Sequence, residues 1–377
     1  MSIPTEGGSS GSEGGSPEIS ALIRGSGQSA KPVTMATIAR EVGVSQGAIS
    51  SLLNERDYGI RVSEKTRARV FKVCRDLGYV PNDLRAVVRI YPELGDTCLM
   101  VSDRIPGGMA NPFLARVTAA VMANTTRQPV SIAVILYDEA REYGFEELPP
   151  PLKHGTASKV ICVGGVNSSI CGVVHGRSLP AILLGHTSQI PGTTSVVPDY
   201  PGAARLALEL LVRHGHKRVG IVGGPFGSPE PRLLEMNRAI GAVACELGLL
   251  VEAQDIFQSD LTFQAGVAAA DSMLARHAKP SALICLSEAA AAGVVAQARF
   301  RGISIPGQLS VIAIADHAGS LASCIPLTAV VLSAAEIAAV AVKEAERQVF
   351  GGIPETASKI VVPVQLIERE SCGPAGN

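Results

Sequence analysis

Residues 33–54 read VTMATIAREVGVSQGAISSLLN, and this stretch predicts two short helices separated by a Gly-Val-Ser turn. Thr34 can cap the first helix, along which apolar residues recur at helical spacing. Gly43 provides the backbone freedom that a tight turn needs, and Ser45 can cap the second helix. The pattern is that of a helix-turn-helix, whose second helix enters the major groove of DNA.

The second helix is expected to separate an apolar face from a small, polar one. Its apolar positions face the core, namely Ile49, Leu52 and Leu53. Its outward positions carry small or polar side chains, namely Gln46, Gly47, Ser50 and Ser51. Such side chains at an exposed helix start allow close approach to base edges. A helical hairpin in another all-α protein is the simpler alternative, but the full combination favours DNA binding.

The charge of the chain is unevenly distributed. The 377 residues carry a formal net charge of −1, yet residues 32–91 contain ten Lys or Arg against six Asp or Glu. A small basic module on a neutral body is typical of a DNA-binding head joined to a larger regulatory part. Within this module a third helix is expected to follow Ser63 and to end at Gly78.

Composition also points to a cytoplasmic protein. Residues 1–31 are rich in Gly and Ser, lack the features of a signal peptide, and are expected to form a disordered tail. No later run reaches the roughly 18–20 apolar residues that span a membrane. The eight cysteines form no CxxC pair, which predicts free thiols. His214 and His216 have no Cys or carboxylate partner close by, so we expect neither a metal nor a cofactor.

From about residue 97 the pattern changes to short apolar runs that alternate with Ala-rich helical segments. The expected strands are 98–101, 131–136, 160–163, 181–184, 219–222, 282–286 and 309–314. The helices between them include 114–124, 202–214, 233–247, 263–276 and 288–301. This alternation predicts parallel sheets covered on both faces. Because the segment is too long for one sheet, we expect two doubly wound lobes with a ligand cleft between them.

An ordered set of motifs extends over nearly the whole chain after residue 32. In the head they are 33–34, 38–39, 43–45, 49–50, 54, 62–63, 65–67 and 77–82. Further along they are 111–113, 197–199, 202–203, 214–219, 223–225, 305–307, 309–312, 326–328 and 368–371. This set resembles the lactose-repressor/galactose-repressor family of bacterial transcription factors. The resemblance implies a helical head, a hinge helix and a periplasmic-binding-protein-like core whose two lobes are joined by three crossings.

The expected fold class is therefore an all-α helix-turn-helix head followed by an α/β core of two doubly wound parallel-sheet lobes. We expect the DNA-binding domain at 32–80 and the hinge and linker at 81–95. The N-terminal lobe of the core would comprise 96–195 with 329–350. The C-terminal lobe would comprise 196–328 with 351–372.

The resemblance also implies roles for residues of the head. Gln46, Gly47 and Ser51 would occupy base-reading positions. Phosphates would be met by Thr34, Ser45, Ser50 and Asn54. Gly47 has no side chain, and Ser51 stands where members of the family often have Arg. Direct readout of bases is therefore expected to be modest, with DNA shape contributing the remaining sequence specificity.

The hinge and one loop depart from the family pattern. Val88 stands where the family usually places a leucine wedge for the minor groove, and Arg85 replaces a small residue. The loop 55–61 is about three residues longer than usual, which fits either a surface insertion or extra phosphate contacts.

The resemblance places an effector site between the lobes. Its expected residues are Asn111, Phe113, Arg232, Ser287 and Asp316. Where the family usually has an Asn-Asp pair, this chain has Ser287-Glu288. Where the family has an aromatic residue followed by two Asp, the chain has Ile-Ala-Asp at 314–316, and Leu332 replaces a usual Gln.

These departures remove polar groups that sugar hydroxyls need once they lose water. A typical pyranose is therefore not expected as the effector. A less polar or anionic ligand at Arg232, or no ligand, fits better, and Arg232 could equally be a surface ion-pair residue.

These observations predict a sequence-specific transcriptional regulator, expected to repress, that binds a palindromic operator in double-stranded DNA as a homodimer. A solute-binding receptor shares the two-lobe core but needs a secretory signal and no helical head. An enzyme is disfavoured, because the chain contains no dinucleotide-binding, Walker or nucleophile-elbow motif, and Asp199 has no paired base or nucleophile.

Overall fold

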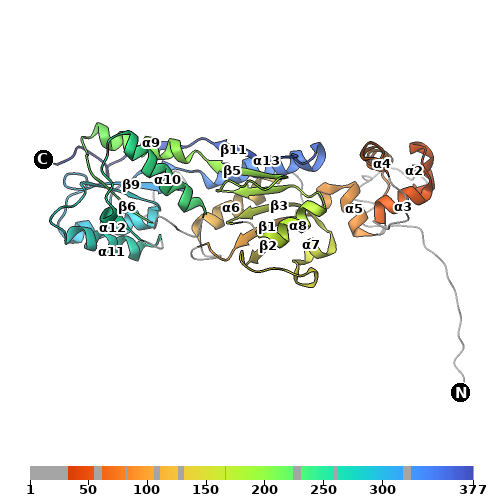
Figure 1. Ribbon diagram of the computed structural model, residues 1–377, viewed down its shortest axis with the longest axis horizontal. Coiled ribbons are helices and arrows are strands. Elements are labelled where there is room, and N and C mark those ends of the chain that lie inside the picture. The colour runs from red at the N-terminus through yellow and green to blue at the C-terminus, as the bar shows by residue number, and fades with distance from the viewer. Residues whose placement is uncertain are drawn as a thin grey trace, which may run out of the picture. The chain divides into compact units, whose positions relative to one another are not determined.

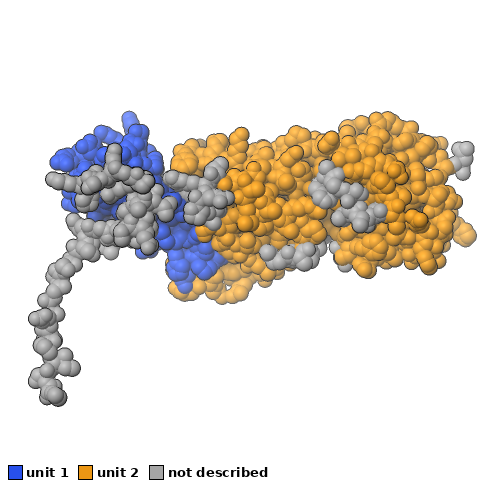
Figure 2. Space-filling view, turned by 180° about the vertical axis from the view of Figure 1, so that it is seen from behind, with its two compact units in different colours: residues 1–96, 149–158 blue, residues 97–148, 159–377 orange. Residues whose placement is uncertain are grey.

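The computed structural model describes residues 33–54, 62–81, 83–105, 111–125, 131–165, 167–223, 231–258, 261–316 and 324–376. The chain divides into two compact units (Figure 2). Unit 1 contains the described residues up to 96 together with 149–158, and unit 2 contains the other described residues. The expected disordered tail and the long loop 55–61 lie outside the described residues.

Unit 1 is built mainly of helices (Figure 1). They are α2 (Met35–Val42), α3 (Gln46–Asn54), α4 (Glu64–Leu77), α5 (Leu84–Ile90), the 3-10 helix η1 (Pro92–Leu94) and α7 (Pro150–His154). The apolar faces of α2, α3 and α4 share one core, in which Ile38, Ile49 and Val70 are fully buried. Burial of such side chains stabilises the head by about 1.5–3 kcal/mol each.

Helix α5 belongs to this core and is not a separate hinge. Val87 and Ile90 are buried with the apolar residues of α2, α3 and α4. The hydroxyl of Tyr91 donates a hydrogen bond to the carbonyl oxygen of Tyr79 at 3.0 Å, and Arg75 Nη1 donates to the carbonyl of Ile90 at 3.1 Å. The expected separation of head and hinge is therefore corrected: the apolar side of α5 matches the head core and packs there.

Unit 2 contains two six-stranded sheets. The first has the order β11-β5-β4-β3-β1-β2, with bounds Ser358–Val362, Thr193–Pro198, Ala181–Leu184, Ala157–Val163, Asp96–Ser102 and Ile132–Tyr137. The second has the order β12-β10-β9-β8-β6-β7, with bounds Gln365–Ile367, Thr328–Val331, Ser310–Ala315, Ala282–Cys285, Val219–Val222 and Ile256–Phe257. Each sheet with its helices is called the first or the second lobe below. Strand β12 runs antiparallel to β10, whereas β10, β9, β8 and β6 are parallel neighbours.

Helices cover both faces of the second sheet (Figure 1). These helices are α9 (Tyr200–Arg213) and α10 (Pro231–Glu246) on one face, and α11 (Phe263–Leu274) and α12 (Glu288–Phe300) on the other. Strand β8 shows why: Ile284 packs with α9 and α10, whereas its neighbours Leu283 and Cys285 pack with α11 and α12. Successive side chains of a strand point to opposite faces, so an unbroken apolar run is buried on both.

The first sheet is covered by α6 (Pro112–Asn124) and α13 (Ala334–Gly351), which pack against one another, and α8 (Ser168–Gly176) follows β3. Among the described residues, no helix is long and apolar enough to cross a membrane.

The chain passes between the two sheets three times, as the family resemblance implies. The crossings follow β5, β10 and β11. The expected lobe boundaries are corrected by this topology. Strand β10 pairs with β9 in the second lobe, although the first lobe was expected to resume at 329. Strand β11 pairs with β5 in the first lobe, although 351–372 was assigned to the second.

Candidate functional site

The turn between α2 and α3 has the hydrogen bonds expected of a helix-turn-helix. The hydroxyl oxygen of Thr34 accepts from the backbone N–H of Thr37 at 3.3 Å and so caps α2. Gly43 has a φ of 77°, in the left-handed region that favours glycine. Ser45 caps α3 by accepting from the N–H of Ala48 at 3.1 Å. The predicted capping roles of Thr34 and Ser45 and the turn at Gly43 are confirmed.

Helix α3 presents its first turn at the surface of the head. The exposed residues there are Ser45, Gln46 and Gly47. Ser50 and Ser51, predicted to point outward, are half-buried, so the accessible face is narrower than the sequence pattern predicts. An exposed helix start combines free backbone N–H groups with room for a base edge, which suits entry into the major groove.

The head also exposes positive charge. Lys65, Lys72 and Arg75 of α4 and Arg40 of α2 are exposed. Lys72 is paired with Asp76 at 2.8 Å, but both side chains are mostly in solvent. A DNA phosphate can replace such a partner at little cost, because exposed ion pairs contribute at most about 1 kcal/mol.

Val88, predicted as a minor-groove wedge, is buried in this structure. Its side chain is 6% exposed, and its Cγ1 lies 2.7 Å from where a Cβ on Gly95 would stand. The wedge prediction is therefore corrected for this conformation, because the side chain of Val88 is buried beside Gly95. Leu84, at the start of α5, is exposed instead. The side chain of Asn54 lies outside the described residues.

In unit 2, charged side chains from both lobes meet at Asp316, which follows β9. Arg232 of α10 places Nη1 3.5 Å from Asp316 Oδ1, and its guanidinium carbon lies 4.2 Å from the ring centroid of Phe113 on α6. Arg116, also on α6, places Nη1 4.0 Å from Asp316 Oδ2. The structure thus brings together Phe113, Arg232 and Asp316, three of the five predicted effector residues.

Arg116 was not predicted as a site residue. It lies three positions after Phe113, on the same face of α6, and is the only charged residue of that helix. A single cation in an otherwise apolar helix beside a predicted cleft residue is the signal that could have identified it.

The other two predicted effector residues cap helices. Asn111 Oδ1 accepts from the N–H of Phe113 at 2.9 Å at the start of α6. Ser287 Oγ accepts from the N–H of Ala290 at 3.0 Å and donates to the carbonyl of Leu261 at 2.7 Å. The single O–H of Ser287 is therefore already used within the fold. Contact of Asn111 or Ser287 with an effector stays a prediction.

Glu288, the first residue of α12, lies near this cluster. It is 7% exposed, and burial raises the pKa of its carboxyl to about 7, with Arg116 opposing and Asp316 reinforcing the change. At neutral pH a large fraction of Glu288 is therefore protonated. The cluster thus combines two guanidinium groups, from Arg116 and Arg232, with the carboxyl group of Asp316.

The Glu288→Gln variant is expected to remove a pH dependence of stability. Because the folded protein binds the Glu288 proton more tightly than the unfolded chain does, wild-type stability should fall as pH rises from about 4.5 to about 7 and then level off. We expect the difference in unfolding free energy between Gln variant and wild type to grow by about 1–3 kcal/mol over that interval. Urea unfolding at several pH values measures it, and a difference independent of pH would contradict the assignment.

Asp199 and His216 have structural partners. Asp199 Oδ1 caps α9 by accepting from the N–H of Gly202 at 2.9 Å. His216 Nδ1 lies 2.8 Å from Ser281 Oγ and its Nε2 lies 3.1 Å from the carbonyl oxygen of Gly373, while burial lowers the pKa of the imidazole. In the described part of the chain, no three His, Cys, Asp or Glu side chains are placed to hold a metal ion.

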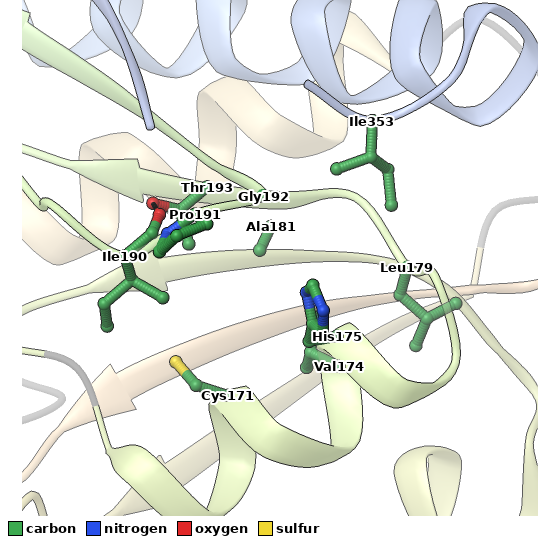
Figure 3. Close-up of a pocket in the computed structure, with 10 residues that line it drawn as sticks. All are labelled: Cys171, Val174, His175, Leu179, Ala181, Ile190, Pro191, Gly192, Thr193 and Ile353. Atoms are coloured by element: carbon green, nitrogen blue, oxygen red, sulfur yellow. Dashed lines mark hydrogen bonds between the residues drawn. The ribbon is translucent and has the colours of Figure 1, made fainter. Parts of the chain in front are cut away.

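A small cavity beside α8 in the first lobe is shown in Figure 3. It has a volume of about 30 Å³ and is lined by residues such as Cys171, His175 and Gly192. This space fits at most a few water molecules, at roughly 10–15 Å³ each. Burial raises the pKa of Cys171 to about 11, so the thiol stays protonated. The cavity is too small for a metabolite.

Two protein-family models match the chain. Residues 34–82 match the model for bacterial regulatory proteins of the lacI family, and residues 208–372 match a periplasmic binding protein-like domain. Among similar proteins, catabolite control protein A of Priestia megaterium is 27% identical over 314 residues, covering 82% of this chain and 91% of the relative. The transcriptional repressor CytR of Escherichia coli is 26% identical over 296 residues, covering 74% and 79%.

Solved structures share the fold. The lac repressor dimer bound to operator and the anti-inducer ONPF is 20% identical, with a TM-score of 0.60, and covers 90% of this chain and 99% of the repressor. The complex of the transcriptional regulator CelR with cellobiose is 21% identical, with a TM-score of 0.60 and the same coverage. Both likenesses extend over the head and the two lobes.

Proposed function

We propose, from the premise that the chain belongs to the lacI family of bacterial regulatory proteins, that it represses transcription as a homodimer on a palindromic operator. The chain is a DNA-binding transcriptional regulator with a periplasmic-binding-protein-like effector domain. The observation that carries the proposal is the exposed first turn of α3, with Ser45 as its cap and Gln46 and Gly47 at the surface. Binding chromosomal DNA would place the protein in the cytoplasm.

In the proposed complex, the first turn of α3 enters the major groove. Gln46 reads a base edge, for which the amide of Gln suits adenine. Gly47 and Ser51 permit close approach. The remaining predicted contacts, Thr34, Ser45, Ser50 and Asn54, meet phosphates through hydroxyl, amide or backbone groups. Paired heads in a two-fold dimer would read two inverted half-sites.

Selection of bound sequences from a random DNA library tests this proposal. Purified protein at near-physiological salt should enrich a palindromic consensus, and its half-site spacing reports the distance between the paired heads. The selection is run with and without a pool of small carboxylates and organic phosphates. Failure to enrich any sequence under both conditions would contradict specific DNA reading by this head.

For the effector we propose a small anion that binds between the lobes at Arg116 and Arg232. Support comes from the convergence of two guanidinium groups from different lobes, with Arg232 3.5 Å and Arg116 4.0 Å from the carboxylate oxygens of Asp316. A carboxylate or phosphate can bond a guanidinium through two parallel N–H groups. The ring of Phe113 beneath Arg232 fixes the guanidinium plane.

This site would couple effector binding to operator affinity. Arg116 and Phe113 belong to the first lobe, whereas Arg232 and Asp316 belong to the second. An anion that bonds both arginines favours one relation of the lobes over another, and only such differential binding can shift the equilibrium.

A further inference from the structure

A second hollow opens where the chain passes between the lobes, and its lining shares no residue with the cluster around Asp316. It has a volume of about 430 Å³ and is lined by the residues at the start of α9, by one face of α10 and by β11. Small-molecule sites in proteins usually measure about 300–1,000 Å³. Arg238 lines this hollow and follows Arg232 by six residues on α10, which places the two side chains about 120° apart around the helix axis.

The charges lining the hollow are not equivalent. The two carboxylates are engaged within the fold: Asp199 caps α9, and Glu235 accepts from the N–H of Thr187 at 2.7 Å and from its hydroxyl at 3.4 Å. The two cations, Arg238 and Lys359, are both exposed. Within the described residues neither cation has an ion-pair partner. The lining therefore carries no net formal charge, but its exposed charges are the two cations, whereas the two carboxylates are half-buried and hydrogen-bonded within the fold.

The rest of the lining is largely apolar. Pro198, Pro201 and Val361 contribute to the walls, and the side chain of Val361 is 50% exposed. Lys359 and Val361 are two positions apart in β11, so their side chains point to the same face of the strand. Tyr200, which also lines the hollow, is 3% exposed, and its hydroxyl donates to the carbonyl of Gly185. A flat apolar group next to an anionic one would match this lining.

We propose that this hollow binds a small organic anion, specifically a phosphate or carboxylate carried on a flat apolar ring. The anionic group lies between Arg238 and Lys359, and the ring lies against Pro198, Pro201 and Val361. Lys359 belongs to the first lobe and Arg238 to the second, so the ligand bridges both. Binding at this hollow therefore acts on the same relation of the two lobes as the proposed site at Arg232.

Calorimetric titration of the full-length protein with 1-naphthyl phosphate tests the proposal. We expect saturable binding, and at least a tenfold weaker Kd for the double variant Arg238→Gln/Lys359→Gln. A matched control, Arg299→Gln/Lys343→Gln, removes two exposed cations elsewhere and should leave the Kd within about twofold. The uncharged analogue 1-naphthol should bind at least tenfold more weakly than the phosphate.

Four outcomes overturn the inference. The first is the absence of saturable binding to the wild type up to about 1 mM, a Kd that corresponds to a binding free energy of about −4 kcal/mol. The second is unchanged binding by the Arg238/Lys359 double variant, and the third is equal binding of 1-naphthol and 1-naphthyl phosphate. The fourth is loss of binding in an Arg232→Met variant that retains Arg238 and Lys359. The last outcome would assign the ligand to the cluster around Asp316. It would thereby separate failure of this inference from failure of the proposed effector site.

Discussion

Replacement of Gln46 by Ala is expected to reduce discrimination between the selected operator and single-base variants by about 5–150-fold, the equivalent of about 1–3 kcal/mol. Gln46 is exposed at the first position of α3, where its amide can reach a base edge. Alanine favours helix at least as well, so the head should remain folded. Phosphate contacts are untouched, so affinity for unrelated DNA and its slope with salt should not change.

The measurement is a set of titrations on matched and mismatched operators at several salt concentrations. Gln365→Ala serves as the control, because Gln365 is an exposed glutamine in the second lobe. An equal loss of affinity on every DNA, with unchanged preference among bases, would mean that Gln46 does not read bases.

Replacement of Arg232 by Met is expected to weaken binding of an anionic effector by about 100-fold. The variant keeps the length and apolar stem of the side chain that packs on Phe113, but loses the bidentate donor. A charge-assisted hydrogen bond contributes about 1.5–3 kcal/mol, and a bidentate pair contributes more. Operator affinity without effector should remain close to that of wild type.

A panel of small carboxylates and organic phosphates, scored by the change in operator affinity, measures this response. Arg205→Met is the control, since Arg205 is an exposed, ion-paired residue of α9 outside the cluster. A wild-type protein whose operator affinity responds to no panel member, or a full response in the Arg232 variant, would refute the proposed anion site.

The helix-turn-helix could be predicted from sequence because its determinants are local. Thr34, Gly43 and Ser45 act on backbone groups within four residues of themselves, so their types and spacing specify the turn directly. The strands at 160–163, 181–184 and 219–222 could be predicted equally well, since each is a short apolar run buried in a parallel sheet.

Strand β5 was missed because its sequence, TTSVVP, is half polar. Its hydroxyl groups are buried, but they are satisfied: Thr194 Oγ1 lies 2.7 Å from Ser358 Oγ of β11, and Ser195 Oγ accepts from the N–H of Ser188 at 3.0 Å. Such partners lie in other segments of the chain. An apolar-run criterion therefore cannot recognise a strand whose polar groups are paired across the sheet.

The misplacement of α5 and of the last strands has a related cause. By residue type alone, the apolar residues of α5 could either insert into the minor groove of DNA or pack in the head core. Only their partners in the three-dimensional structure distinguish these two roles. In the same way, β10 and β11 were not among the predicted strands, and nothing in their own residues indicates the sheet to which each belongs. The contribution of Arg116 to the interlobe cluster likewise depends on its distance from Asp316, which no local motif encodes.

Near the C-terminus, β11 joins the first sheet and β12 joins the second, and this arrangement bears on the order in which the parts of the protein fold during synthesis. The first sheet needs β11 to complete its edge and α13 to cover it, and Thr194 of β5 meets Ser358 only 164 residues later. The first lobe therefore cannot finish folding until β11 has left the ribosome, nor the second until β12 has, whereas α2 to α5 can fold soon after they emerge. During translation, a head able to meet DNA precedes the lobes that would regulate it.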